Sequence, residues 1–185
     1  MKKETYYFPK EGAENTEKTV ELAKKKAKEL GINEVVVAST HGKTAKKVID
    51  SLEDQNINIV VVTICEAYSE EGWTMNDEEK SEIEEKGATV LTCPHTLSAG
   101  IGESFENNLG AEEIVADTLY RFSQGMKVCV EIVLMAADAG LIDMNQEVLA
   151  IGGTDNGADT CTVIKPSYTR KFDDLEIKEI IAMPR

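Results

Sequence analysis

Short runs of β-branched residues alternate with amphipathic segments of helical period, and this alternation constrains the fold more than any other feature of the chain. Residues 34–38 read Glu-Val-Val-Val-Ala, and residues 57–64 and 88–92 form two further runs rich in Val, Ile and Thr. Apolar runs of this length are typical of strands that are buried on both faces of a parallel sheet. The first half of the chain therefore predicts parallel strands joined by helices.

Helical spacing of apolar residues, together with start and stop signals, predicts five helices. The first starts near Thr16 and stops at Gly31, and the third begins after Asn76, whose side chain is suited to cap it. The last is apolar nearly all round, as a core helix is. The expected helices cover residues 16–30, 43–52, 77–87, 111–123 and 126–139.

The second half of the chain predicts an antiparallel finish to the sheet. Residues 147–151, 160–165 and 177–183 have strand composition, and the loop 152–157 is too short for a crossover helix. The two strands that flank this loop are therefore expected to be antiparallel neighbours. The predicted fold is a single α/β domain over residues 1–185, a three-layer sandwich whose mostly parallel sheet has an antiparallel edge strand.

The charge balance excludes two classes of partner. The chain of 185 residues has 34 acidic and 20 basic residues, a net charge of -14. Nucleic acids and anionic membranes both require clustered basic side chains, so we expect neither as a partner. No segment has the ~18 consecutive apolar residues of a membrane span, and no apolar segment follows the charged N-terminus as in a secretory signal. We expect a cytoplasmic protein, and the sequence leaves a homo-oligomer open.

Cysteine and histidine usage predicts neither a disulfide framework nor a metal site. The four cysteines are far apart, with no Cys-x-x-Cys pair, and the chain has two histidines, His41 and His95. Zinc clusters and disulfide scaffolds need closer spacing. We expect reduced, mostly buried thiols and no metal.

The loop after the first predicted strand is suited to an anion. Residues 39–44 read Ser-Thr-His-Gly-Lys-Thr, with three hydroxyls, a glycine and a lysine at the start of a helix. Free N–H groups at a helix start bind phosphate, and ligands of open α/β sheets lie at the carboxyl ends of strands. The alternative is that a hydroxyl only caps the helix. The loop does not match the nucleotide P-loop pattern.

Three further loops follow predicted strands. Residues 152–157 read Gly-Gly-Thr-Asp-Asn-Gly, which fits a hairpin turn or a bare backbone that a ligand approaches. In residues 93–103, His95 is either a general base or a hydrogen-bonded loop residue, and Cys93 is expected to be inert. Residues 65–68, with nearby Trp73, form either an apolar wall or a plain loop. The long segment 94–110 is expected to cover a ligand.

Two segments of the chain resemble the C-terminal α/β domain of pyruvate kinase. Residues 35–45 are similar to the strand, Ser/Thr-rich loop and helix start that open that domain, and residues 147–163 are similar to its final hairpin. The resemblance spans most of the chain and implies a stand-alone pyruvate-kinase-C-like protein of the archaeal type. The catalytic barrel has no counterpart, so no kinase activity is implied. In many members of the family this loop holds a phosphate of a sugar-bisphosphate effector, although His41 replaces the usual hydroxyl residue.

The resemblance and the loops together lead to a hypothesis about the ligand. We expect a phosphorylated small molecule, flavin mononucleotide (FMN), with its phosphate on residues 39–44 and its ring under residues 93–102. The alternatives are an enzyme acting on a phosphorylated metabolite, with His95 or Glu66 as acid–base group, and a regulatory module that binds a sugar phosphate. The expected site residues are Ser39, Thr40, His41, Gly42, Lys43, Thr44, Cys65, Pro94, His95, Gly100, Ile101, Gly152, Gly153, Thr154, Asp155 and Asn156.

Overall fold

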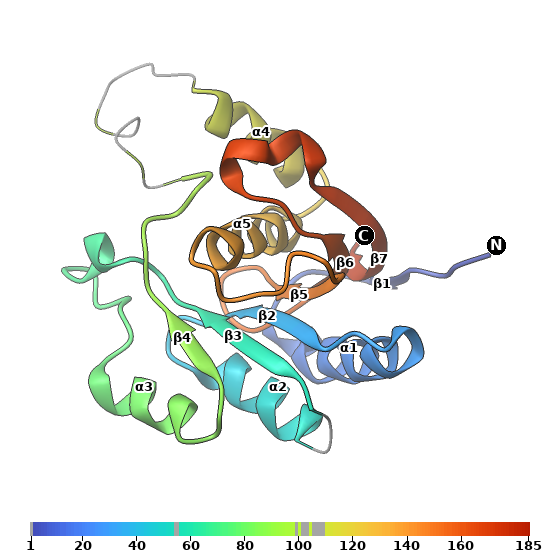
Figure 1. The fold of residues 1–185 in the computed structure, drawn as a ribbon, viewed down its shortest axis with the longest axis horizontal. Coiled ribbons are helices and arrows are strands. Elements are labelled where there is room, and N and C mark those ends of the chain that lie inside the picture. The colour runs from blue at the N-terminus through green and yellow to red at the C-terminus, as the bar shows by residue number, and fades with distance from the viewer. Residues whose placement is uncertain (1, 54–55, 99, 101–103, 105–109) are drawn as a thin grey trace.

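Seven strands form one continuous sheet through the centre of the molecule (Figure 1). The computed structural model describes residues 2–53, 56–98, 100, 104 and 110–185. The strand order is β1-β7-β6-β5-β2-β3-β4. The strands are β1 (Tyr6–Phe8), β2 (Glu34–Ala38), β3 (Asn58–Val62), β4 (Thr89–Leu91), β5 (Val148–Gly152), β6 (Thr160–Lys165) and β7 (Glu176–Pro184).

The pairing follows the predicted division into a parallel and an antiparallel part. The strands β5, β2, β3 and β4 are parallel neighbours, whereas β6 is antiparallel to both β5 and β7. The strand β1 was not expected from the sequence, and it extends the antiparallel side by pairing parallel with β7. This strand has three residues, and its Tyr6 and Tyr7 are exposed, so its sequence has no buried apolar run.

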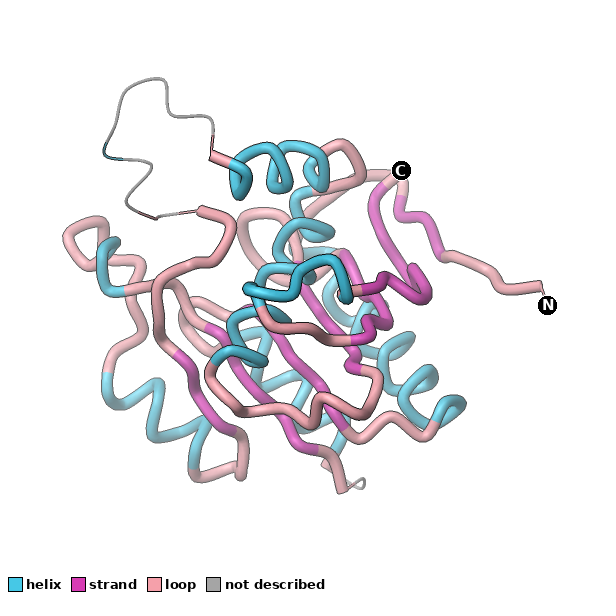
Figure 2. Tube along the Cα trace, turned by 45° about the horizontal axis from the view of Figure 1, so that its top comes forward, coloured by secondary structure: helices cyan, strands magenta, loops and turns pink. Residues whose placement is uncertain are grey.

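Helices cover both faces of the sheet and complete the three layers (Figures 1 and 2). One core cluster joins one face of the sheet to α1 (Thr16–Leu30), α2 (Lys43–Leu52) and Ile83 of α3 (Asp77–Glu84). The other core cluster joins the opposite face to α4 (Ala111–Tyr120) and α5 (Gln124–Asp138). Short 3-10 helices in the described structure include η1 (Ala13–Asn15), η2 (Glu66–Tyr68) and η4 (Thr169–Asp174). The three-layer α/β architecture is confirmed.

The helix α5 packs across the middle of the sheet, and nearly all of its residues are buried. It begins two residues before the predicted start, because Ser123 caps it: the Ser123 hydroxyl accepts a hydrogen bond of 3.0 Å from the N–H of Met126. Among the residues that the structure describes, no helix is both long and apolar enough to traverse a bilayer.

Candidate functional site

The four loops singled out by the sequence leave the sheet at the same edge. Ala38 of β2 pairs with Val62 of β3, which pairs with Leu91 of β4, and Val37 pairs with Ile151 of β5. These strands are parallel, so their carboxyl ends lie side by side at spacings of about 4.8 Å. The order of the loops along this edge is residues 153–159, 39–42, 63–65 and 92–95.

The loop 39–44 begins α2 with a glycine rather than with a capping hydroxyl. Gly42 is the N-cap in the left-handed conformation, with φ 76°, and no side chain caps the helix from this position. A Cβ on Gly42 would lie 2.8 Å from Cδ1 of Ile83, so the packing of α3 also requires glycine. The Ser39 hydroxyl accepts a hydrogen bond of 3.2 Å from the N–H of Ala45. One of the three hydroxyls therefore satisfies the helix, as the capping alternative predicted.

The first N–H groups of α2 remain available. Within the described part of the chain, the backbone N–H groups of Lys43 and Thr44 have no protein acceptor. Lys43 is exposed and has no ion-pair partner among the same residues, whereas Thr44 is buried against the helix start. Unpaired N–H groups and a lysine at a helix N-terminus create a positive potential that favours an anion.

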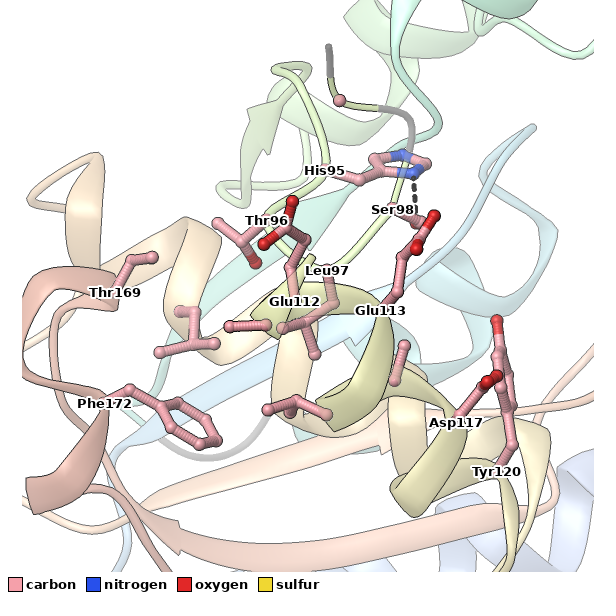
Figure 3. A pocket seen from close by; sticks show the side chains of 15 residues that line it. His95, Thr96, Leu97, Ser98, Glu112, Glu113, Asp117, Tyr120, Thr169 and Phe172 are labelled. Atoms are coloured by element: carbon pink, nitrogen blue, oxygen red, sulfur yellow. Dashed lines mark hydrogen bonds between the residues drawn. The ribbon is translucent and has the colours of Figure 1, made fainter. Parts of the chain in front are cut away.

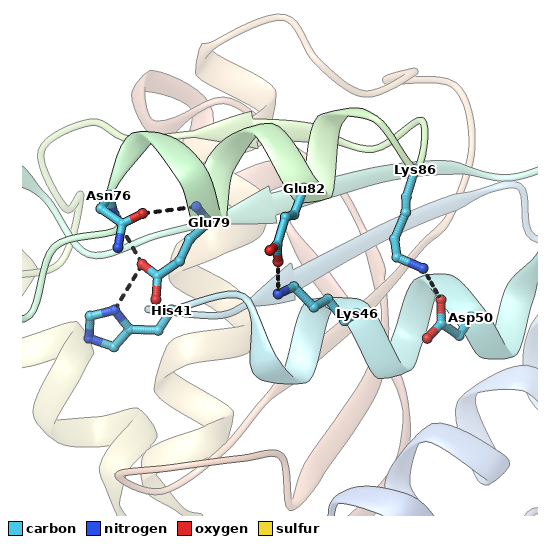
Figure 4. Close-up of polar contacts among 7 residues, drawn as sticks. All are labelled: His41, Lys46, Asp50, Asn76, Glu79, Glu82 and Lys86. Carbon is cyan, nitrogen blue, oxygen red and sulfur yellow. Dashed lines mark hydrogen bonds and ion pairs between the residues drawn. The ribbon is translucent and has the colours of Figure 1, made fainter.

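His41 is held by α3 and not by the loop itself (Figure 4). Its Nδ1 lies 3.2 Å from Oε2 of Glu79, which also accepts a hydrogen bond of 3.0 Å from the N–H of Asn76. Burial raises the pKa of the Glu79 carboxyl, but the N–H of Asn76 and His41 outweigh it and lower the pKa below its ordinary value. His41 thus fastens the loop to the N-terminus of α3, where Asn76 forms a capping box with Glu79.

The glycines after β5 have a packing explanation. A Cβ on Gly152 would lie 2.9 Å from the carbonyl oxygen of Gly125 and 3.2 Å from Sγ of Cys129, both on α5. A Cβ on Gly153 would lie 2.5 Å from the carbonyl oxygen of Gly157 inside the same turn. Close approach of α5 and a tight turn account for both residues, which favours the hairpin interpretation for these two positions.

The next residues of the same turn retain one polar atom without a partner. Thr154 is buried, and its hydroxyl has no hydrogen-bond partner in the described structure, although its N–H donates to Asp159 at 3.2 Å. Asp155 and Asn156 are exposed, and Asp155 has a positive φ of 51°. A hollow of about 280 Å³ lies between residues 154–156 and the segment from Glu11 to Ala13.

His95 connects the loops after β3 and β4. Its Nε2 accepts a hydrogen bond of 3.3 Å from the N–H of Cys65, and its Nδ1 lies 3.5 Å from the Ser98 hydroxyl. Because Nε2 is an acceptor here, the neutral ring has its proton on Nδ1. Pro94 and Gly100 are exposed at the surface beside it. Ile101 lies outside the described residues.

A buried ion pair beneath His95 escaped the sequence analysis. Nζ of Lys127 lies 2.6 Å from Oε2 of Glu131, and both side chains are less than a tenth exposed. The same Nζ donates to the Ser98 hydroxyl at 2.8 Å, and Oε1 of Glu131 accepts from the N–H of Leu97 at 2.9 Å. The signal that could have found the pair is two opposite charges at i and i+4 within an otherwise apolar helix.

A cavity of about 690 Å³ opens between this loop, α4, α5 and η4 (Figure 3). Of the predicted site residues, His95 and Gly100 line it, whereas residues 39–44 and 152–156 do not. Its lining includes the apolar side chains of Leu97 and Phe172 and the carboxylates of Glu112, Glu113 and Asp117. The three carboxylates disfavour a phosphate in this cavity. The predicted residues thus share one edge of the sheet but do not share one cavity.

Residues 17–164 match the family model of the pyruvate kinase alpha/beta domain. The chain belongs to this family. Two solved structures of pyruvate kinase from Cryptosporidium parvum are similar at 10% sequence identity, with TM-scores of 0.43 and 0.41. Each alignment covers 82% of this chain but 23% and 22% of the respective kinase chain. The chain therefore corresponds to less than a quarter of the length of those kinases.

The family match includes every predicted site residue. It begins within α1 and ends within β6, so β1, η1, η4 and β7 lie outside it. The loops after β2, β3, β4 and β5 all lie inside the matched pyruvate kinase alpha/beta domain segment. The resemblance read from residues 35–45 and 147–163 is confirmed at the level of the family.

Proposed function

We propose that the protein binds a phosphorylated small molecule, FMN, at the carboxyl ends of β2 to β5. The observation that carries the proposal is the start of α2, where Gly42 leaves the N–H groups of Lys43 and Thr44 without a protein acceptor. A phosphate at this position accepts hydrogen bonds from the N–H groups of the helix N-terminus and also interacts with the Lys43 ammonium group. Charge-assisted hydrogen bonds of this kind contribute roughly 1.5–3 kcal/mol each.

The neighbouring loop supports an anion at the same edge. Thr154 follows β5, the strand beside β2, and its buried hydroxyl has no partner in the described structure. Buried hydroxyls normally have a hydrogen-bond partner, and an oxygen of a phosphate on the α2 loop would supply one. On the other side of β2, the buried residues Cys65 and Leu97 offer an apolar wall for the ring.

The enzyme alternative has less support than binding. The Nε2 of His95 accepts the N–H of Cys65, so this nitrogen serves to join two loops in the structure. Glu66 is exposed in η2. A regulatory sugar-phosphate site uses the same α2 N-terminus, and it is distinguished from an FMN site by ligand competition.

The decisive experiment compares FMN with riboflavin, which has the same ring and polyol chain but no phosphate. Flavin fluorescence is followed while the protein is titrated into FMN and, separately, into riboflavin. Because the phosphate anchors the ligand, FMN is expected to bind at least about ten-fold more tightly than riboflavin. Equal affinities of FMN and riboflavin would contradict the assignment of the phosphate to the α2 loop. Displacement of FMN by fructose 1,6-bisphosphate at much lower concentration would favour the sugar-phosphate alternative.

A matched pair of variants locates the phosphate. Lys43→Ala removes one positive charge at the N-terminus of α2, whereas Lys47→Ala removes the same charge one turn further along, where Lys47 pairs with Glu17. We expect Lys43→Ala to weaken FMN binding at least about five-fold and Lys47→Ala to have little effect. Equal weakening by both variants would indicate a general charge effect and contradict the assignment.

A further inference from the structure

Three aromatic rings form a stack over the carboxyl ends of β3 and β4. Tyr68 is the middle ring: its centroid lies 5.7 Å from Trp73 at an interplanar angle of 22°, and 6.2 Å from His95 at 25°. Trp73 is the single tryptophan of the chain and is 51% exposed, although it is a large apolar side chain. One end of this aromatic stack is therefore anchored by His95, and the other end is accessible to solvent.

The aromatic stack lies at the same sheet edge as the proposed phosphate loop and is connected to it through the start of α3. Trp73 precedes Asn76 by three residues, and Asn76 is linked through Glu79 to His41 of that loop (Figure 4). His95 follows β4, which is two strands away from β2. Two strand spacings amount to about 10 Å, so the His95 end of the stack and the phosphate loop lie at the same edge of the sheet.

We propose that Trp73 is the stacking surface for the planar heteroaromatic ring of the phosphorylated ligand, an inference that rests on the proposed function. The stack holds the indole in place before the ligand arrives, so little side-chain freedom is lost on binding. Planar rings stack on such aromatic side chains through their π-faces.

The charges around the stack fix which end of the ligand lies there. Glu66, Glu70 and Glu71 are exposed in the segment between β3 and α3 that includes Tyr68 and Trp73. These carboxylates repel a phosphate, whereas Lys43 and the N-terminus of α2 attract one. The ring therefore belongs over Trp73 and the phosphate on residues 39–44, and the reverse orientation is disfavoured.

The test compares FMN, AMP and ribose 5-phosphate on the wild-type protein and on Trp73→Leu. All three probes have a phosphate, but ribose 5-phosphate has no ring. We expect Trp73→Leu to weaken FMN binding at least about five-fold and to leave ribose 5-phosphate binding unchanged. The emission of the bound flavin, measured at saturating protein, should rise because the quenching indole is gone. Trp73→Phe should retain most of the affinity, and its circular dichroism spectrum checks that the fold is kept.

Each outcome separates this inference from the proposed function. Unchanged FMN affinity and unchanged bound-flavin emission in Trp73→Leu would overturn the stacking assignment, while the Lys43→Ala effect would still support the phosphate loop. Equal weakening of FMN and ribose 5-phosphate would also overturn it, because the substitution would then act on the phosphate site. Tighter binding of AMP than of FMN, lost in Trp73→Leu, would support the stacking surface with a purine as its ring. If none of the probes binds to the wild-type protein, both proposals fail.

Discussion

Lys127 and Glu131 lie one turn apart on α5 and form an ion pair of 2.6 Å in the interior of the protein. The pair also holds the segment after β4, because the Ser98 hydroxyl and the N–H of Leu97 bind to it. His95, in turn, lies 3.5 Å from Ser98. A salt bridge within the core thus positions a loop at the edge of the sheet where the ligand is proposed to bind.

Removing one member of this pair should be far more damaging than removing both. Glu131→Leu leaves the buried Lys127 ammonium group without its carboxylate, which is expected to lower the free energy of unfolding by about 3–5 kcal/mol. The double variant Lys127→Met, Glu131→Leu replaces both charges with apolar side chains and should be less destabilised than Glu131→Leu alone. Urea unfolding of the wild type, the two single variants and the double variant measures this coupling. Additive losses would contradict the interpretation of a paired, desolvated bridge.

Gly152→Ala distinguishes a packing role from a ligand role for the loop after β5. The new methyl group would lie 2.9 Å from the carbonyl oxygen of Gly125, so α5 would have to move. Overpacking of this kind typically costs about 1–3 kcal/mol, and we expect a loss of that size in thermal or urea unfolding. Gly100→Ala is the matched control, because a Cβ there has no atom of the described residues within 4 Å. Full stability of Gly152→Ala together with weakened FMN binding would restore the ligand interpretation.

The fold was predictable because each element has a local signal. The Val-rich runs of β2 and β3 and the glycines that end α1 and α5 are visible in the sequence without any knowledge of packing. The strand β1 was not predictable, since Tyr6 and Tyr7 are exposed and the strand exists only because β7 offers an edge. The start of α5 was misplaced because the cap by Ser123 was overlooked.

The site was predictable as a set of loops but not as a set of contacts. The rule that ligands lie at the carboxyl ends of strands brought residues 39–44 and 152–156 to the same edge correctly. Nothing in the sequence shows that His41 turns to Glu79, or that Gly152 is glycine because α5 passes close by. Such facts depend on the distance between helices, which periodicity does not encode. The three stacked rings are equally non-local, because His95 is 27 residues from Tyr68 and comes from another loop.

The cysteines should differ sharply in reactivity while all four remain thiols. Burial raises the pKa of Cys129 to about 12 and raises that of Cys161 well above its ordinary value. Cys93 is half-buried, and burial raises its pKa less. In the native protein at about pH 8, we expect a thiol reagent to leave Cys129 and Cys161 unmodified on the time scale of minutes, because thiolates react and thiols do not. After denaturation the reagent should count four thiols. A count of two would reveal a disulfide and contradict the expectation of reduced cysteines.

The contact between Glu79 and its partners predicts how stability depends on pH. The pKa of Glu79 in the folded protein is lowered, because the stabilising N–H of Asn76 and His41 outweigh the effect of burial. A carboxyl with a lowered folded pKa contributes stability above its unfolded pKa of about 4.3, and this contribution is lost as the pH falls through the folded value.

Glu79→Ala also removes half of the capping box, so it should lower the free energy of unfolding by about 1 kcal/mol at pH 7. The difference from the wild type should shrink as the pH falls below the unfolded pKa and the folded carboxyl becomes protonated. Glu78→Ala is the control, since it removes the same charge from the same first turn without these contacts. Urea unfolding at several pH values measures both variants, and a loss for Glu79→Ala that is independent of pH would show that the charge of Glu79 is not what stabilises the start of α3.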